Sequence, residues 1–151
     1  MTSEQPYRQV LVVDDDPDVR DILVTALRQQ PVVIHEAADG AAAMRLLREN
    51  TYSVVLLDIL MPGVGGFEVL DAIDQTSRTA PVVLVVSGAD RAVLEQLDSR
   101  RIHGIVKKPF DPQEVASVVA ACVEIRGRST FETMALATMM SGAPLIALLK
   151  L

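Results

Sequence analysis

Carboxylate side chains follow two of the most apolar runs in this chain. One run, Val10 to Val13, leads directly into Asp14 and Asp15, and a second apolar run ends at Asp58. Short aliphatic runs bounded by turn residues are typical of strands that are buried on both faces of a sheet. Because the carboxyl ends of parallel strands meet at one edge, where open α/β sheets bind their ligands, we expect these carboxylates to lie together.

A hydroxyl group and an amino group follow two further apolar runs. The run that begins at Val82 ends at Ser87, and a short run that begins at Ile105 leads into Lys108. Carboxylate oxygens are preferred ligands of Mg²⁺, a carboxylate can act as a nucleophile, and a lysine binds phosphate oxygens as a point charge. The set therefore indicates a site for a divalent metal and a phosphoryl group, with Asp58 as the nucleophile.

Each of these residues, taken alone, has a simpler explanation. Asp16 followed by Pro17 is a favoured helix start, so we interpret Asp16 as a helix cap. Ser87 can belong to an ordinary turn, Lys107 to a solvated loop, and a single aspartate after a strand is more often a turn residue than a nucleophile. The occurrence of such residues after four different strands favours the functional interpretation.

Strand-like and helix-like runs alternate along most of the chain. Strands are expected at about 9–13, 32–36, 53–57, 81–86 and 104–107, and helices at about 17–28, 41–50, 67–73, 90–100 and 112–126. The apolar spacing of the first helix predicts a buried face made of Val19, Ile22, Leu23, Ala26 and Leu27. Alternating strands and helices with short connections predict a doubly wound, five-stranded parallel sheet with the flavodoxin-like order 2-1-3-4-5.

Composition restricts the class of protein. The 151 residues suffice for one ordinary domain. The formal net charge of −6 argues against nucleic-acid binding, which requires clustered lysine and arginine. Cys122 is the only cysteine, so no internal disulfide can form, and a free thiol fits a reducing compartment. Because residues 1–9 carry no apolar signal core, we expect a cytoplasmic protein.

Residues 127–151 differ from the rest of the chain. Residues 127–130 read as a linker, and 131–141 are expected to form one more helix before Gly142 and Pro144 interrupt the pattern. No charged residue occurs between 133 and 149, but this interrupted stretch is short for a membrane span, so membrane insertion is not expected. We expect a short helical tail that covers an apolar patch of its own domain or of a partner.

Four motifs together resemble those of CheY-like receiver domains of two-component response regulators. They are Val12-Val13-Asp14-Asp15-Asp16-Pro17, Leu57-Asp58-Ile59-Leu60-Met61-Pro62-Gly63, Ser87-Gly88-Ala89 and Val106-Lys107-Lys108-Pro109-Phe110. The resemblance covers about residues 8–126 and leaves 127–151 as a linker and apolar C-terminal extension. It implies a phosphorylation-dependent signalling switch of a phosphorelay, a phosphoacceptor rather than an enzyme.

The resemblance also implies a role for each site residue. Asp58 would accept a phosphoryl group from a phosphohistidine of a sensor histidine kinase or phosphotransfer protein. Asp15, Asp58 and the backbone carbonyl of Leu60 would bind Mg²⁺ directly, and Asp14 would act mostly through water. Of the two lysines, Lys108 directly precedes the proline and looks like the family's phosphate-binding lysine, and Ser87 at the end of its strand looks like the switch hydroxyl.

Three features depart from the family pattern. The position three residues before the lysine, usually Tyr or Phe, is Ile105, Gly65 replaces a usual acidic residue, and residues 127–151 resemble no output domain. These features keep open a second hypothesis, a constitutive interaction module that acts through its C-terminal tail. A homodimer through the tail, or through the face of helix 4, strand 5 and helix 5, is a further expectation.

Two other classes are disfavoured by the sequence. A metal-dependent phosphatase on a similar sheet would carry a second acid two residues after its nucleophile, where this chain has Leu60. A dinucleotide site would need a glycine-rich loop after the first strand, where this chain is acidic.

Overall fold

The computed structural model describes residues 8–73 and 80–126. Five parallel strands form one sheet with the order β2-β1-β3-β4-β5, which confirms the predicted flavodoxin-like order. The strands are β1 (Gln9–Val13), β2 (Val33–Ala37), β3 (Val54–Leu57), β4 (Val82–Ser87) and β5 (Gly104–Lys107). Their bounds agree with the sequence-based ranges to within one residue.

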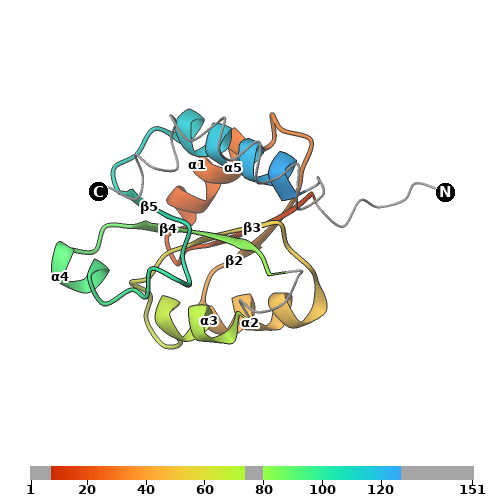
Figure 1. Cartoon of the computed structure of the whole chain (residues 1–151). Helices are drawn as coiled ribbons and strands as arrows, with labels where there is room; N and C mark the ends of the chain where they lie inside the picture. The colour runs from red at the N-terminus through yellow and green to blue at the C-terminus, as the bar shows by residue number, and fades with distance from the viewer. Residues whose placement is uncertain (1–7, 74–79, 127–151) are drawn as a thin grey trace.

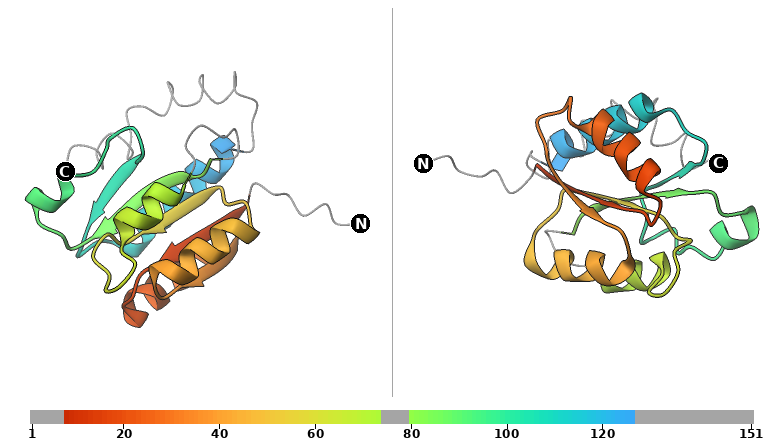
Figure 2. Two further views of the ribbon diagram at one scale, coloured as in Figure 1. Left: turned by 90° about the horizontal axis from the view of Figure 1, so that it is seen from below. Right: turned by 180° about the vertical axis from the view of Figure 1, so that it is seen from behind.

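In the described residues, four helices connect the five strands and a fifth follows the last strand. They are α1 (Pro17–Leu27), α2 (Gly40–Glu49), α3 (Gly66–Ala72), α4 (Arg91–Leu94) and α5 (Pro112–Arg126). In Figure 1, α1 and α5 lie above the sheet, and α2 and α3 lie below it. The view from below in Figure 2 shows α2 and α3 in front of the strands. This is the doubly wound arrangement expected from the alternation of elements.

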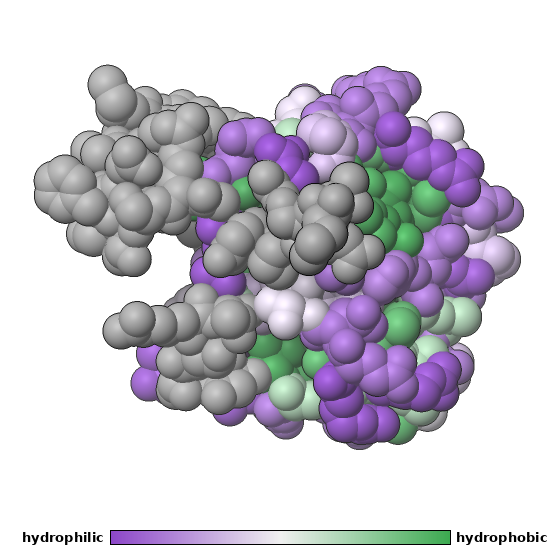
Figure 3. All heavy atoms as spheres, turned by 90° about the vertical axis from the view of Figure 1, so that its right-hand side faces the viewer, coloured by the Kyte–Doolittle hydropathy of each residue, from purple (hydrophilic) through white to green (hydrophobic). Residues whose placement is uncertain are grey.

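Alternate residues of each strand pack into opposite helical layers. Val10 and Val12 of β1 belong to the core cluster between the sheet and helices α1 and α5. Leu11 and Val13 belong to the lower core, the cluster between the sheet and helices α2 and α3. A strand with helices on both faces must be apolar at every position. This requirement explains the continuous aliphatic runs in the sequence. Hydrophilic residues make up most of the described surface on the side shown in Figure 3.

Aspartate caps determine where several helices begin. The side chain of Asp16 accepts a hydrogen bond from the backbone N–H of Asp18 at 2.9 Å, and Pro17 occupies the first helical position. Asp39 and Asp90 cap α2 and α4 in the same manner. Capping oxygens satisfy backbone donors that lack a partner in the first turn of a helix. The prediction that Asp16 is a helix cap is therefore confirmed.

The helix predicted over residues 90–100 is wrong in length, because α4 ends at Leu94. Beyond it, the carboxylate of Asp98 accepts a hydrogen bond from the backbone N–H of Arg100 at 2.9 Å and two more from its guanidinium. An aspartate that binds a nearby backbone donor competes with helical hydrogen bonding. Leu97 nevertheless packs against the lower core, so the apolar spacing indicated burial but not a helix.

The predicted inward face of α1 also needs one correction. Ile22 has 47% of its surface exposed. The residues of α1 that are buried are Leu23, Val24, Ala26 and Leu27. The buried stripe is centred on Leu23 and Leu27, and Ile22 lies about 100° away from Leu23 around the helix. Spacing alone did not show that Val24, rather than Ile22, would turn toward the sheet.

Some predictions concern segments beyond the described ranges. The C-terminal extension predicted over 127–151 lies outside the described residues. Within residues 8–73 and 80–126, no helix has both the length and the apolar character needed to cross a membrane.

Candidate functional site

The pairing of β1 with β3 places Asp14 and Asp58 beside each other. Val13 lies opposite Leu57 in the parallel register, so the residues that follow emerge together. The backbone N–H of Asp58 donates to the carbonyl of Val13 at 2.9 Å, and that of Asp14 donates to the carbonyl of Ala37 at 3.2 Å. Both acids are buried, with 1% of Asp14 and 4% of Asp58 exposed.

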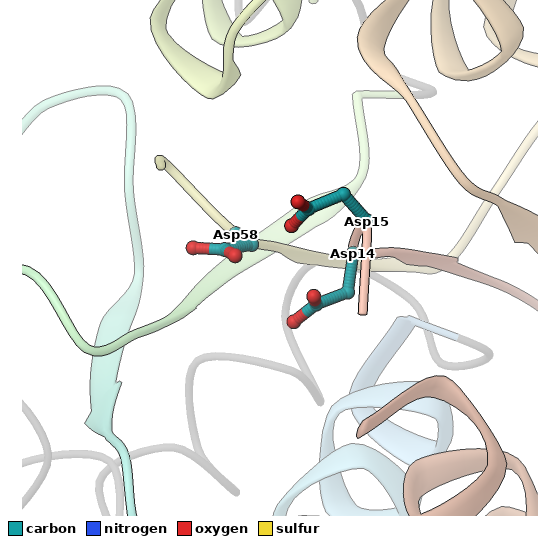
Figure 4. Close-up of side chains that lie close together, drawn as sticks. All are labelled: Asp14, Asp15 and Asp58. Atoms are coloured by element: carbon teal, nitrogen blue, oxygen red, sulfur yellow. The ribbon is translucent and has the colours of Figure 1, made fainter. Parts of the chain in front are cut away.

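Asp15 completes a group of three carboxylates. One oxygen from each of Asp14, Asp15 and Asp58 lies within 4.8 Å of the others. Figure 4 shows that the three carboxylates point toward the same side, two from the end of β1 and one from the end of β3. Asp15 is exposed, unlike the other two. The structure therefore brings together the three acids that the sequence predicted.

Lys108 bridges the two buried acids. Its Nζ lies 2.7 Å from Oδ2 of Asp14 and 3.2 Å from Oδ2 of Asp58. The side chain is 22% exposed, so the ammonium is mostly withdrawn from water. Lys107, its neighbour on β5, is exposed, as predicted for a solvated residue. Lys108 is therefore the lysine of the site, and its peptide bond to Pro109 is cis.

Ser87 lies at the end of β4 and is completely buried. Its Oγ accepts a hydrogen bond from the backbone N–H of Ala89 at 3.2 Å, which leaves its own hydroxyl hydrogen to donate elsewhere. The backbone carbonyl of Ser87 accepts from the N–H of Lys108 at 3.0 Å. Ser87 and Lys108 are thus joined directly through the backbone.

The predicted ligand Leu60 contacts the site through its backbone. Its N–H donates to Oδ1 of Asp58 at 3.1 Å. Together with the Lys108 contact at Oδ2, this bond occupies both oxygens of the Asp58 carboxylate. The Leu60 side chain is 52% exposed. The role of its carbonyl as a metal ligand stays a prediction.

Burial and charge act against each other in this cluster. Burial raises the pKa of the Asp58 carboxyl above its ordinary value, Lys108 opposes this shift, and Asp14 adds to it. For Lys108, burial acts to lower the pKa, but the bonds and charges of Asp14 and Asp58 together outweigh burial, so that its pKa is raised. The lysine therefore remains charged, while ionised Asp58 is held at a cost in free energy.

Gly66 allows α3 to begin close to the end of β3, where Asp58 lies. A Cβ at this position would lie 2.4 Å from the carbonyl oxygen of Asp58 and 2.5 Å from Cα of Ile59. Both are backbone atoms that no side-chain rotation can move. At the preceding Gly65, by contrast, the nearest atoms would lie 3.8 Å away. Close packing thus requires glycine at position 66, and the connection between β3 and α3 depends on it.

Arg20 is a site residue that sequence reasoning missed. Its Nη1 donates to the backbone carbonyl of Asp14 at 2.7 Å, and its Nε lies 3.6 Å from Oε1 of Glu36 on β2. Side chains on a helix tilt toward its N-terminus, and Arg20 is the fourth residue of a helix that starts at Pro17. This position in the first turn was the available signal that Arg20 would reach back to the acidic turn.

The donor set fits a hard divalent cation. Three carboxylates and one ammonium leave two negative charges at the site. Mg²⁺ takes oxygen ligands such as these, whereas zinc usually takes histidine or cysteine. Neither belongs to the group in the described part of the chain. The residues present therefore fit Mg²⁺, with Asp14, Asp15 and Asp58 as the side chains that would hold it.

Comparison with known sequences agrees with this geometry. Residues 10–120 match the family model described as the response regulator receiver domain. The chain is 32% identical over 124 residues to the transcriptional regulatory protein SrrA of Staphylococcus aureus, which takes in 82% of this chain and 51% of SrrA. The chain therefore spans about half the length of the curated relatives that it matches.

Solved structures show the same architecture. The response regulator TrrA from Thermotoga maritima, in complex with Mg²⁺–BeF, is 28% identical, with a TM-score of 0.66 over 76% of this chain and 98% of that one. A CheY-like receiver domain protein from Methanospirillum hungatei is 20% identical, with a TM-score of 0.68 over 79% of this chain and 95% of that one. At that lower identity the likeness shows the fold alone.

Proposed function

Because this chain belongs to the response regulator receiver domains of two-component signalling, we propose that Asp58 accepts a phosphoryl group and thereby switches the protein. Receiver domains pair with histidine kinases, so the donor would be a phosphohistidine of a kinase or phosphotransfer protein. The observation that carries the proposal is the convergence of three carboxylates within 4.8 Å, two of them bound to Lys108.

The transfer needs a nucleophile and positive charge around the phosphoryl group. An oxygen of Asp58 attacks phosphorus, the new O–P bond forms as the N–P bond breaks, and the electron pair of that bond returns to the histidine nitrogen. Mg²⁺, when bound by Asp14, Asp15, Asp58 and the Leu60 carbonyl, supplies charge neutralisation. The response regulator TrrA was solved in complex with Mg²⁺–BeF, which supports a site here that takes Mg²⁺ together with a phosphoryl group.

We propose that Lys108 and Ser87 detect the new group. The Lys108 ammonium, now bound to two carboxylates, would bind a phosphoryl oxygen as a point charge. The free hydrogen of the buried Ser87 hydroxyl would donate to another. The phosphoryl group adds about −1.5 to −2 charge. Because Ser87 and Lys108 share a backbone hydrogen bond, their movements are coupled, and the surface of α4, β5 and α5 would change.

The proposal is tested by intact-protein mass spectrometry after incubation with acetyl phosphate and Mg²⁺. We expect one added phosphoryl group on the wild type and none on Asp58→Ala. Asp16→Asn is the matched control, because it alters a neighbouring exposed acid that caps α1 and should leave labelling intact. Equal labelling of Asp58→Ala and the wild type would show that Asp58 is not the acceptor.

A second candidate is a constitutive interaction module. Ile105 occupies the position of the family's usual aromatic residue, and it packs, partly buried, against the lower core rather than presenting a ring that can rotate. On this account the proposed extension over 127–151 mediates self-association or docking regardless of phosphorylation of the proposed receiver, residues 8–126. Removal of residues 127–151 should then convert an oligomer into a monomer, as measured by the mass in solution. Monomers both with and without these residues would count against self-association through the tail.

A further inference from the structure

Arg20 closes on the acidic turn from two directions. Its backbone N–H donates to the carbonyl of Asp16 at 3.1 Å, and its Nη1 donates to the carbonyl of Asp14 at 2.7 Å. Its Nε also forms an ion pair with Glu36 at 3.6 Å. The side chain is 18% exposed, so these contacts are made largely out of water. One arginine thus joins α1, the end of β1 and the edge strand β2.

We propose that Arg20 is a positioning residue for the metal site, which it serves by holding the Asp14 carbonyl and so orienting Asp15. The inference rests on the proposed function, because it concerns Mg²⁺ at the three carboxylates. Arg20 itself would contact neither the metal nor the phosphoryl group. Its effect would pass through the peptide that links Asp14 to Asp15.

Asp15 is the acid that most needs such support. The carboxylates of Asp14 and Asp58 are each held by two hydrogen bonds. The exposed Asp15 carboxylate has no hydrogen-bond partner among residues 8–73 and 80–126. A peptide unit is planar, so a fixed carbonyl oxygen on Asp14 also fixes the direction of the following N–Cα bond. The backbone is therefore what aims the Asp15 side chain.

The positive charge of Arg20 would weaken Mg²⁺ binding, whereas its hold on the Asp14 carbonyl would strengthen it. A guanidinium near the site repels a divalent cation, so its removal could strengthen metal binding. Glu36 compensates this charge, whereas the hydrogen bond to Asp14 is short and mostly shielded from water. We therefore expect positioning to outweigh repulsion. The two effects predict opposite changes in the Kd for Mg²⁺ when Arg20 is replaced, which makes the inference testable.

The test is calorimetric titration of the full chain with MgCl₂ alone. We expect Arg20→Ala to raise the Kd for Mg²⁺ about tenfold, at the lower end of the loss caused by removal of an outer hydrogen-bond partner. Arg20→Lys keeps a donor and should recover part of the affinity. Arg91→Ala is the matched control, because it breaks another Arg–Glu pair, Arg91–Glu95, whose arginine side chain is 90% exposed, and should leave the Kd unchanged.

The outcomes separate this inference from the proposed function. An unchanged or lower Kd in Arg20→Ala overturns the inference about Arg20. If the Kd is unchanged and the unfolding temperature in EDTA is lower, the role of Arg20 is merely structural. If Arg20→Ala does not fold, Arg20→Gln and Arg20→Lys decide, and wild-type affinity in both overturns the inference. A wild type that does not bind Mg²⁺ contradicts the proposed metal site, and this inference fails with it.

Discussion

The two ends of the parallel sheet hold polar side chains in different ways. At the amino-terminal end, the hydroxyl of Tyr52 lies 2.6 Å from Nδ1 of His35, and Nδ1 of His103 accepts from the backbone N–H of Val83 at 3.0 Å. Burial raises the pKa of Tyr52 to about 12, and burial followed by the charge of Arg126 lowers the pKa of His103. Both shifts favour neutral side chains with hydrogen-bond partners.

The carboxyl-terminal end holds charges instead. Asp14 and Asp58 are buried, Asp15 lies beside them, and Lys108 is the ammonium that contacts the buried pair. Like charges in one site disfavour ionisation, and burial adds to the cost. The amino-terminal end therefore contributes to the stability of the fold. The carboxyl-terminal end holds buried charge at a cost in free energy, which Mg²⁺ would reduce under the proposed function.

The largest expected effect is the loss of the ammonium at the charged end. Lys108→Met should lower the free energy of unfolding by about 3 kcal/mol at pH 7, because removal of one partner leaves buried carboxylates without compensation. The loss should shrink as the pH falls and Asp58, whose pKa is raised by burial, takes up a proton. Urea denaturation without metal, at pH 7 and at lower pH, measures the loss in the free energy of unfolding and its dependence on pH.

Lys107→Met is the matched control for that comparison. Lys107 is the adjacent residue of β5 and is exposed, so its substitution should change the free energy of unfolding by less than about 0.5 kcal/mol. An equal loss for the two lysines would show that the charged end does not depend on the Lys108 contacts.

A second prediction concerns the backbone support of Asp58. Gly66→Ala should cost about 2 kcal/mol, because its Cβ would meet the Asp58 carbonyl at 2.4 Å and the backbone must move. Gly65→Ala should be nearly neutral, since the nearest atoms lie 3.8 Å from its Cβ. Denaturation of the two variants side by side would contradict this account if Gly65→Ala were the more damaging change.

The smallest effect is expected at the neutral end. Folding lowers the pKa of His103, so its contribution is complete above the unfolded value of about 6.5 and is lost as the pH falls from there toward the folded pKa. In that window the unfolded chain binds more protons. His103→Asn offers Val83 a non-titrating acceptor, so it should abolish this part of the pH dependence, to be measured by thermal unfolding between pH 7 and 5. An unaltered profile would assign it to other groups.

The sequence was most informative where one physical requirement controls many residues. Parallel strands covered on both faces must be aliphatic throughout, and their carboxyl ends must meet, so the sheet order and the grouping of Asp14, Asp58 and Lys108 were predictable. The cap at Asp16 was predictable for a similar reason, because proline and an acidic residue together define a helix start.

The remaining features depend on local geometry that apolar spacing does not contain. α4 ends at Leu94, before Asp98 binds the backbone N–H of Arg100, and the rotation of α1 exposes Ile22. Two adjacent glycines do not indicate by themselves that Gly66, rather than Gly65, contacts Asp58. The position of Arg20 in the first turn of α1 indicated the direction of its side chain but did not identify the backbone carbonyl that it binds.

The most direct test of the central claim is the stability of wild type and Asp58→Asn with and without Mg²⁺. Without metal at pH 7, Asp58→Asn should be more stable by about 1 kcal/mol, because folding raises the pKa of Asp58 and the buried charge is unfavourable. The difference should shrink as the pH falls from the folded pKa of Asp58 toward its unfolded value of about 3.9. Mg²⁺ should stabilise the wild type more than the variant and so close the gap. A less stable variant without metal, or equal stabilisation of both proteins by Mg²⁺, would contradict the account.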